Sequence, residues 1–501
     1  MKTISALLYS AATLALMSTG PSSVQAYSES FDLLDHTNLF SYYHPANTNL
    51  TAEQTALPAQ CSVDQVHIVS RHATRYPSTG SYNGIKSVYT KVQQKLQQAN
   101  ASVHIVGRHA TRYPSNGSYN GLKRIGDKVQ QKLQANVSIL ASELHFLKTW
   151  NLDEMITDPA HQIENLTALG LTEAYDFGTS VRKKYAHLYQ QDATVWSGSV
   201  ERVQLTAKSF MQGLFGQKAV DNHYANLITS NSSDKTIAAN TLTPIDTCTN
   251  FPKSLSGPYQ TAFQATWVPQ SLARLEKLWP GFEFIADDLV GMMDLCVYEM
   301  ALRSKDERRF CKIFTDEEWQ NYNYNKDLGY YYDSGYGNPR ARTAAYPYVA
   351  AVARLLAQPK TASCQKIYAA FSHDTQLSIF LTAFGVNEDA TPLGSSATDL
   401  KRKFRASRSL LMGARLVTER INCGSEGSFV RLTVNDAVVP FDDCKDGPGL
   451  SCSLEKYLIR LKGIEAKAGD FMTQCGVVAA PGLSSVNTLF ENPARNLCSY
   501  C

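Results

Sequence analysis

The hydrophobic positions of the chain fall into short apolar runs, each followed by a polar break and then by a segment of helical periodicity. Runs of this length are typical of buried strands. We expect strands at 66–69, 194–197, 367–372 and 415–422, with another near 428–434. We expect flanking helices at 91–98, 166–189, 200–214, 344–357 and 375–384. The alternation of strands and helices predicts an α/β fold with a mostly parallel central sheet flanked by helices.

A different pattern separates these runs in the middle of the chain. Residues 222–335 are rich in tyrosine, asparagine and charge and lack regular strand alternation. Together with 138–190, they are interpreted as a smaller, mostly helical cap domain over one edge of the sheet. No linker rich in proline, glycine or serine separates the two parts, so we expect them to pack as one unit with a pocket where they meet.

Two stretches of the chain repeat each other. Residues 66–97 and 103–134 align without a gap, and each copy is predicted to form a strand, a loop closed by proline, and a helix. Solenoid folds need three or more such units, so two copies do not indicate one. A single sheet can accommodate only one copy of this strand. A tandem exon duplication, present in the protein or only in its gene model, explains the second copy.

The repeated loop, "RHATRYP", carries specific chemistry. Its first copy contains Arg71, His72 and Arg75. Two arginines four positions apart place two planar, bidentate donors around one tetrahedral oxyanion, and a neutral imidazole beside them is a candidate nucleophile. An isolated motif of this kind is more often a solvated basic turn. The strand before it and the helix after it favour a phosphate-binding loop at the carboxyl end of a strand.

A second polar break follows a later strand, in "FSHDT". His373 offers another imidazole for phosphate, and Asp374 offers a carboxyl that could protonate a leaving alcohol. The alternative is that Asp374 only caps the following helix. Its combination with the arginine loop favours the catalytic interpretation.

These motifs resemble those of the histidine acid phosphatases, and most closely the secreted fungal phytase and acid phosphatase branch of the phosphoglycerate-mutase-like superfamily. The family pattern is R-H-G-x-R-x-P early in the chain and H-D late in it. Further stretches are similar to the family, among them "VWSGSVERVQLTAKSFMQGLF" (195–215) and "YYYDSGYGNP" (330–339). The resemblance covers about Cys61 to Cys475.

The resemblance implies a role for each motif residue. His72 would be the nucleophile that becomes phosphohistidine, and Asp374 would protonate the leaving oxygen. Arg71, Arg75 and His373 would bind phosphate, with Arg202 as a third arginine. No metal and no cofactor is implied. The chain departs from the family at Ala73, where glycine is usual, and a required positive φ there would lower activity.

The second copy supplies an alternative set of the same residues: His109 as nucleophile, with Arg108 and Arg112 binding phosphate. Cys61 precedes the first copy by the family's usual interval, and Asn116, a glycosylation acceptor, would place a glycan at the mouth of a pocket built from the second. The residues that follow the second copy, in turn, match the family's usual continuation. We favour the first copy.

The resemblance also implies four disulfides, Cys61–Cys423, Cys248–Cys475, Cys296–Cys311 and Cys444–Cys452. The spacing of the eleven cysteines alone does not select these pairs. Cys364 would then be a buried free thiol, and Cys498 and Cys501 would form a pair or lie in a free tail.

The N-terminal segment and the glycosylation sequons indicate a secreted protein. Residues 1–26 are typical of a signal peptide, followed by an N-terminal arm (27–60), the phosphatase domain (61–475) and a C-terminal tail (476–501). A formal net charge of +3 gives no indication of a nucleic-acid or membrane surface. N-linked glycans are expected at sequons Asn49, Asn100, Asn116, Asn136, Asn165 and Asn231. An extracellular or cell-wall location follows.

The expected function is hydrolysis of phosphate monoesters at acid pH through a phosphohistidine, with phytate among the candidate substrates. A phosphoryl-transferring mutase and a catalytically inactive secreted glycoprotein that keeps the fold are the alternatives. The basic run 400–408 could form a rim for phytate, although such runs are more often solvated surface. The sequence makes no prediction of oligomeric state.

Overall fold

The computed structural model describes residues 31–97, 142–148, 150, 152, 155–190, 193–221, 225–230, 241–303, 308–358 and 365–478. The predicted signal peptide, the second motif copy with Arg108, His109 and Arg112, and Cys364, Cys498 and Cys501 lie outside these residues. The first motif copy lies within them.

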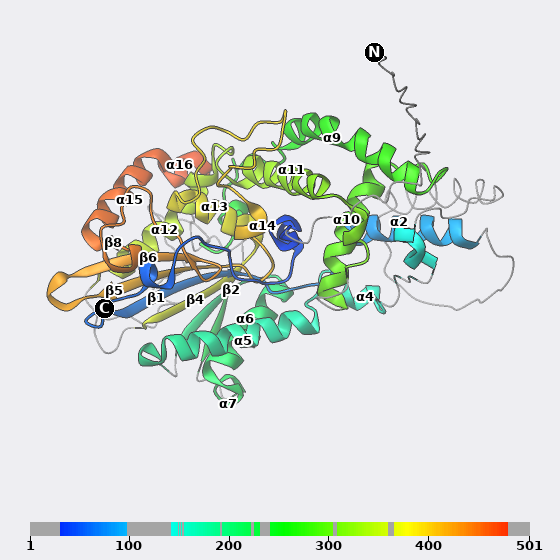
Figure 1. The fold of residues 1–501 in the computed structure, drawn as a ribbon. Helices are drawn as coiled ribbons and strands as arrows, with labels where there is room; N and C mark the ends of the chain where they lie inside the picture. The colour runs from blue at the N-terminus through cyan, green and yellow to red at the C-terminus, as the bar shows by residue number, and fades with distance from the viewer. Residues whose placement is uncertain are drawn as a thin grey trace, which may run out of the picture.

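A central sheet of eight strands organises the fold (Figure 1). Its strands are β1 (Ser62–Arg71), β2 (Thr194–Gly198), β3 (Asn226–Ser230), β4 (Ile367–Ser372), β5 (Arg415–Asn422), β6 (Ser428–Val434), β7 (Ala437–Val438) and β8 (Cys452–Ser453). The order is β3-β2-β4-β1-β5-β6-β7, with β8 beside β6. Strands β3, β2, β4 and β1 are parallel, whereas β5, β6, β7 and β8 pair antiparallel with their neighbours.

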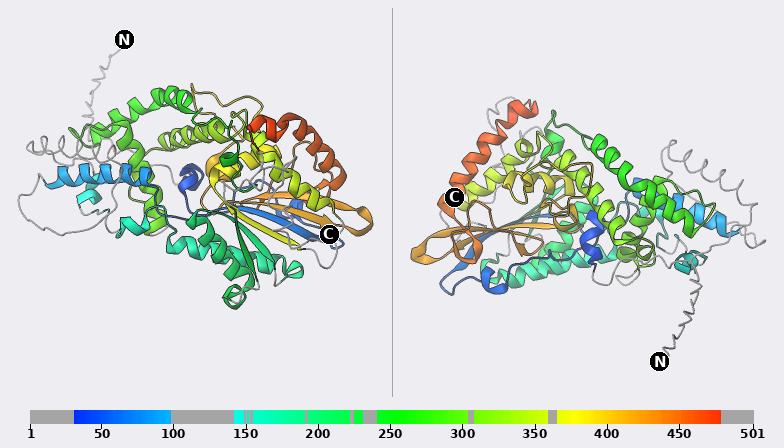
Figure 2. Two further views of the ribbon diagram at one scale, coloured as in Figure 1. Left: turned by 180° about the vertical axis from the view of Figure 1, so that it is seen from behind. Right: turned by 45° about the horizontal axis from the view of Figure 1, so that its top comes forward.

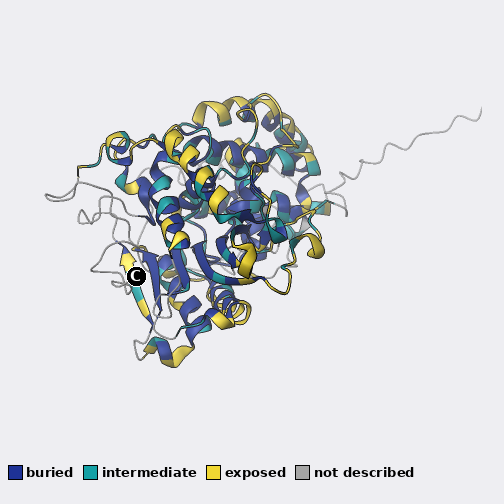
Figure 3. Ribbon diagram, turned by 90° about the vertical axis from the view of Figure 1, so that its left-hand side faces the viewer, coloured by how far each residue is buried: buried dark blue, intermediate teal, exposed yellow. Residues whose placement is uncertain are grey.

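Helices cover both faces of the sheet (Figures 1 and 2). On one face lie α5 (Ala168–Lys184) and α6 (Glu201–Phe215), and on the other lie α12 (Ala341–Ala357), α13 (Asp374–Phe384) and α15 (Leu454–Ala468). The strands between these layers are largely buried, and exposed positions gather on the outer sides of the helices (Figure 3). The α/β sheet flanked by helices is therefore confirmed, with its parallel part restricted to four strands.

A second, helical part extends beyond the edge of the sheet at the right of Figure 1. It contains α2 (Thr79–Gln97), η3 (Ser142–Lys148), α9 (Gly257–Leu278), α10 (Ala286–Leu302) and α11 (Asp316–Ser334). Its own core includes Trp150, Trp279, Trp319 and Met293. Lys91 of α2 forms an ion pair with Asp288 of α10, which ties the helix of the first motif copy into this core. Short helices complete the structure: α1 (Ala52–Thr55), α4 (Pro159–Gln162), α7 (Gln217–Asp221), α8 (Pro244–Thr247), α14 (Ala406–Ser409) and α16 (Phe471–Cys475).

The helical part differs from the predicted cap at two places. Helix α5, expected in the cap, packs on α6, and its Phe177 and Val181 share a core with strand residues such as Ile68. Strand β3, within the segment expected to lack strands, forms an edge of the sheet. The remaining cap boundaries stay a prediction. Among the described residues, no helix is both long and apolar enough to cross a membrane.

The N-terminal arm and the basic run 400–408 pack against each other. Arg408 pairs with Asp35 of the arm at 2.5 Å, and Arg402, only 3 % exposed, pairs with Asp327 of α11 at 2.6 Å. Lys403 reaches Asp442 at 2.9 Å. The run is therefore neither a free basic rim nor mere solvated surface, because three of its cations already have carboxylate partners.

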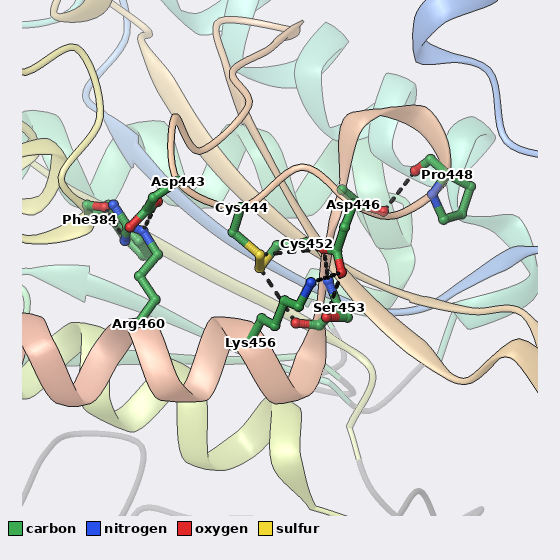
Figure 4. Close-up of a disulfide and its surroundings, with 10 residues drawn as sticks. Phe384, Asp443, Cys444, Asp446, Pro448, Cys452, Ser453, Lys456 and Arg460 are labelled. Carbon is green, nitrogen blue, oxygen red and sulfur yellow. Dashed lines mark hydrogen bonds and ion pairs between the residues drawn. A yellow bond between two sulfur atoms is a disulfide. The ribbon is translucent and has the colours of Figure 1, made fainter.

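All four disulfides implied by the resemblance are present: Cys61–Cys423, Cys248–Cys475, Cys296–Cys311 and Cys444–Cys452. The first joins the start of β1 to the end of β5. The fourth closes a loop beside α15, where Asp446 accepts hydrogen bonds from Ser453 N at 3.0 Å and Ser453 Oγ at 3.1 Å (Figure 4).

Glycines set the close approach of α5 and α6. A Cβ on Gly178 would lie 2.1 Å from the carbonyl oxygen of Phe210, a distance that real contacts do not show. We predict that Gly178→Ala lowers the free energy of unfolding by about 1–3 kcal/mol because the helices must separate. Gly463→Ala, in the exposed interior of α15 with nothing within 4 Å of its Cβ, is the control and should raise it by about 0.5–1 kcal/mol. Denaturant unfolding of both variants checks this, and an unchanged Gly178→Ala would contradict the packing.

Candidate active site

The predicted site residues converge at the carboxyl ends of three parallel strands. Arg71, the last residue of β1, lies opposite Ser372, the last residue of β4. His72 N donates a hydrogen bond to the carbonyl of Ser372 at 3.1 Å. His373 and Asp374 come directly after β4, and Arg202 lies in the first turn of α6, which follows β2. Segments 71–75, 202 and 373–374 therefore meet at one edge of the sheet.

The motif loop is fixed by contacts from several elements. Ala73 N donates to Thr206 Oγ1 of α6 at 3.1 Å, and Gly413 N donates to the carbonyl of His72 at 2.8 Å. Thr167 N donates to the carbonyl of Thr74 at 3.1 Å. Ala73 does not adopt a positive φ. The methyl group that replaces the usual glycine hydrogen is therefore compatible with the loop.

His72 is held in the form that a nucleophile needs. Its Nδ1 lies 2.9 Å from the carbonyl oxygen of Ala73, and since a carbonyl only accepts, Nδ1 carries the proton. The lone pair is then on Nε2. Burial, and after it the charges of Arg71 and Arg75, lower the pKa of His72 well below its ordinary value. Both effects favour the neutral form of the imidazole.

Arg71 is completely buried and held by backbone oxygens. Its Nη1 donates to the carbonyls of Leu39 at 2.5 Å and Leu410 at 2.6 Å. Its Nη2 lies 2.7 Å from Asp374 Oδ2. Leu39 belongs to the N-terminal arm, so the arm helps to aim this guanidinium.

Asp374 also interacts with the following backbone and with the helical part. Its Oδ1 accepts a hydrogen bond from Thr375 N at 2.8 Å, and burial, followed by the charge of Asp374, raises the pKa of Tyr330 of α11. Burial alone would raise the pKa of Asp374, but Arg71, His373 and Arg75 lower it below its ordinary value. These charges favour the carboxylate form of Asp374, which is also the first residue of α13.

The remaining predicted residues, His373 and Arg202, complete a site in which positive charges predominate. The His373 ring lies 5.9 Å from that of His72, centroid to centroid, and burial followed by the charge of Arg202 lowers its pKa to about 4. Burial and the charge of Arg75 lower the pKa of Arg202. The mutual effects of these groups indicate an excess of positive charge.

Three guanidinium groups present donors that this structure leaves unused. The Nε atoms of Arg71, Arg75 and Arg202 are buried, and none has a hydrogen-bond partner among the described residues. Buried donors are normally satisfied, so three together indicate a site for an anion with several oxygens. A tetrahedral phosphoryl group fits both this charge and this donor set.

Several groups that contribute to the site were not predicted from the sequence. They are the carbonyls of Leu39 and Leu410, the hydroxyl of Thr206, Tyr330, and Glu164, whose Oε2 lies 3.6 Å from Arg202 Nη1. Backbone carbonyls carry no sequence signal, and the others come from segments far from either motif. Two of them lie in stretches that are similar to the family: Thr206 in 195–215 and Tyr330 in 330–339.

The fold and this constellation define a class of protein, the α/β enzymes that hold a phosphoryl group at the carboxyl ends of parallel strands. The chain belongs to the histidine phosphatase superfamily (branch 2), whose family model matches residues 101–435. It is 31 % identical over 435 residues to the acid phosphatase PHO1 of Komagataella pastoris, covering 83 % of this chain and 81 % of that protein.

Two further relatives carry the name phytase. The chain is 29 % identical to phytase PHO112 of Candida albicans, covering 84 % of this chain and 83 % of the relative. The crystal structure of the phytase from D. castellii superimposes with a TM-score of 0.75 at 26 % identity, covering 92 % of this chain and 90 % of that one. The family resemblance of the motifs is thereby confirmed.

The family match includes the second copy of the motif, whereas the described structure contains the first. The match begins at residue 101 and so takes in the second copy, which continues without a gap into the residues that follow it. In the described part of the chain, β1 and its loop come from the first copy, next to the Cys61–Cys423 disulfide. The catalytic copy therefore stays a proposal.

One group of potential metal ligands occurs among the described residues. Cys444, Asp446 and Cys452 have ligand atoms within 4.8 Å of one another. Both sulfur atoms are bonded to each other, and Lys456 already pairs with Asp446 at 3.0 Å (Figure 4). The group is a closed disulfide loop and does not offer a ligand set.

Thr206 provides a test of how the motif loop is held. Its Oγ1 accepts from Ala73 N and donates to the carbonyl of Arg202 at 2.7 Å. We predict that the nearly isosteric Thr206→Val lowers the free energy of unfolding by about 1–3 kcal/mol, since it leaves the buried Ala73 N–H unpaired. Thr206→Ser keeps the hydroxyl and should lose less than half as much. Equal stability of the two variants in denaturant unfolding would contradict this role.

Proposed function

We propose that the protein hydrolyses phosphate monoesters at acid pH through a phosphohistidine at His72. The observation that carries the proposal is the set of three buried arginine Nε–H groups without hydrogen-bond partners among the described residues, on residues that lie at the same strand ends as His72 and Asp374. Phosphoryl transfer requires chiefly positioning and charge stabilisation, and three arginines supply both.

The reaction has two steps. In the first, Arg71, Arg75, Arg202 and His373 hold the phosphoryl group while Nε2 of His72 attacks phosphorus. The bond from phosphorus to the ester oxygen breaks, and Asp374 gives that oxygen its proton. In the second, Asp374 takes a proton from water, the water oxygen attacks phosphorus, and the phosphorus–nitrogen bond breaks to release inorganic phosphate.

The charge state of the site fits an acid optimum. The pKa of His72 lies well below its ordinary value, because of burial and the arginines, so acid does not remove the nucleophile. Asp374 needs a proton to act, and the charge of Arg71, which lowers the pKa of Asp374, opposes this protonation. A bound phosphate anion neutralises part of the charge of Arg71, and the pKa of Asp374 then rises. Activity should fall as rising pH removes this proton.

The substrates are small phosphate monoesters, with phytate among them. Relatives named acid phosphatase and phytase support this range. The basic run 400–408 contributes less to phytate binding than its sequence suggests, because Arg402, Lys403 and Arg408 are paired elsewhere. We propose no metal, no cofactor, no nucleic-acid partner and no membrane partner.

The proposed location is extracellular or in the cell wall. The signal-like residues 1–26 and the four disulfides support passage through an oxidising compartment. N-glycans are proposed at the sequons. An inactive glycoprotein is not favoured, because the chain retains every residue that the proposed chemistry uses: the first motif copy supplies Arg71, His72 and Arg75, and later segments supply Arg202, His373 and Asp374.

The two motif copies can be separated by mutation. We predict that His72→Ala abolishes turnover of p-nitrophenyl phosphate, whereas His109→Ala keeps most of it, because His72 lies at the end of β1 beside Asp374 and the arginines. Steady-state rates at acid pH measure this. Loss in His109→Ala alone, or equal loss in both variants, would overturn the assignment.

Asp374→Asn tests the proton donor. The amide keeps the size of the side chain but has no acidic proton, so esters with poor leaving groups should suffer most. We predict a loss of about 10²–10⁴-fold on glycerol phosphate and a much smaller loss on p-nitrophenyl phosphate, whose leaving group departs unprotonated. The ratio of kcat values on the two substrates is the measurement. Equal losses would mean that Asp374 serves only to begin α13 or to orient Arg71.

A further inference from the structure

Glu164 lies between α4 and α5 and is bound to the motif loop through its backbone. Its N–H donates to the carbonyl of Pro77 at 3.1 Å, and the next residue, Asn165, accepts from Tyr76 N at 2.9 Å. Glu164 has a φ of 67°. A left-handed backbone at a residue other than glycine costs free energy, and such conformations gather at functional sites. The surrounding contacts therefore hold Glu164 in a backbone conformation that it would not adopt on its own.

The carboxylate of Glu164 points at the proposed phosphate site. Its Oε2 lies 3.6 Å from Arg202 Nη1, and its Oε1 accepts from Thr79 N at 3.3 Å and Thr79 Oγ1 at 3.4 Å, at the start of α2. The Glu164 side chain is 46 % exposed and that of Arg202 is 19 % exposed. A second carboxylate, more exposed than Asp374, thus contacts one of the three arginines of the proposed site.

We propose that Glu164 is a specificity-determining counter-ion that competes with the substrate for Arg202. The inference rests on the proposed function, since it takes Arg202 to be a phosphate ligand. Glu164 neutralises part of the charge of Arg202. An incoming phosphoryl group must displace this contact or bind beside it, and like charges a few ångströms apart repel.

Two consequences follow for ligands of different charge. Inorganic phosphate, the product, binds more weakly than three arginines alone would allow, which favours its release. Phytate carries several further phosphate groups around the pocket opening, so the half-exposed carboxylate opposes it more than it opposes a simple monoester. Glu164 thereby biases the site toward small monoesters.

The chain offers a closely matched control. Glu388 pairs with Arg342 at 3.2 Å, with side chains 48 % and 21 % exposed, and follows the end of α13 away from Asp374. Glu164→Gln and Glu388→Gln each remove one charge from an ion pair of similar exposure. Only the first pair includes a residue of the proposed site.

The experiment measures inhibition by inorganic phosphate and KM for p-nitrophenyl phosphate and phytate, at fixed acid pH and ionic strength. We expect Glu164→Gln to lower the Ki of phosphate about 3–10-fold and to lower the KM of phytate by a larger factor than that of p-nitrophenyl phosphate. Glu388→Gln should leave all three within twofold. In an Arg202→Gln background, the effect of Glu164→Gln on Ki should shrink to less than half.

The outcomes separate this inference from the proposed function. If wild type turns over substrate through His72 but Glu164→Gln leaves Ki within twofold, the counter-ion role is wrong. That role is also wrong if Glu388→Gln has an equal effect, or if the effect persists in full without Arg202. A wild type without turnover that depends on a motif histidine would refute the proposed function instead. Glu164→Asp, which keeps the charge, should behave like wild type, and a melting temperature near that of wild type excludes misfolding.

Discussion

The site depends on one buried ion pair, between Arg71 Nη2 and Asp374 Oδ2 at 2.7 Å. It joins the end of β1 to the start of α13, two segments about three hundred residues apart in the chain that the parallel pairing of β1 with β4 brings to one edge. A buried guanidinium is stable only when its charge and its N–H groups have partners. The carbonyls of Leu39 and Leu410 supply two, Asp374 supplies the charge, and Nε remains available to a ligand. The contacts that pack the arm, the sheet and α13 together therefore also position the residues of the site.

The same charges account for the chemistry proposed at acid pH. Burial and the arginines together keep the imidazole of His72 neutral, and its hydrogen bond to the carbonyl of Ala73 leaves Nε2 free. The arginines that suppress protonation of His72 also hold Asp374 as a carboxylate until an anion arrives. In the proposed mechanism, binding of phosphate favours protonation of Asp374, because the anion offsets part of the positive charge that opposes it. Segments outside the two motifs also reach these groups: burial and the charge of Asp374 raise the pKa of Tyr330 of α11, and Glu164 contacts Arg202.

Much of the fold and the site could be predicted from the sequence. All five predicted strands are observed within a few residues, because short apolar runs next to polar breaks are a local signal. The motif residues are also identifiable, since the strand before the motif and the helix after it favour a phosphate-binding loop over a solvated basic turn. Three features were not predictable: the antiparallel half of the sheet, the packing of α5 on the sheet, and the backbone carbonyls that bind Arg71. Strand direction, helix packing and backbone hydrogen bonds all depend on tertiary contacts. The inward pairing of Arg402 and Arg408 likewise depends on Asp327 and Asp35, distant in sequence.

The most direct test of the phosphohistidine mechanism is to trap the covalent intermediate and locate it. The enzyme is mixed with substrate, denatured at alkaline pH within milliseconds to preserve phosphohistidine, and cleaved after lysine only. Trypsin would not serve, because both copies give the same peptide, "HATR", whereas cleavage after lysine places His72 in the peptide ending at Lys86 and His109 in residues 96–123. We predict phosphate on the His72 peptide, and none there in His72→Ala. Phosphate on residues 96–123, or no covalent phosphate during turnover, would contradict the mechanism at His72.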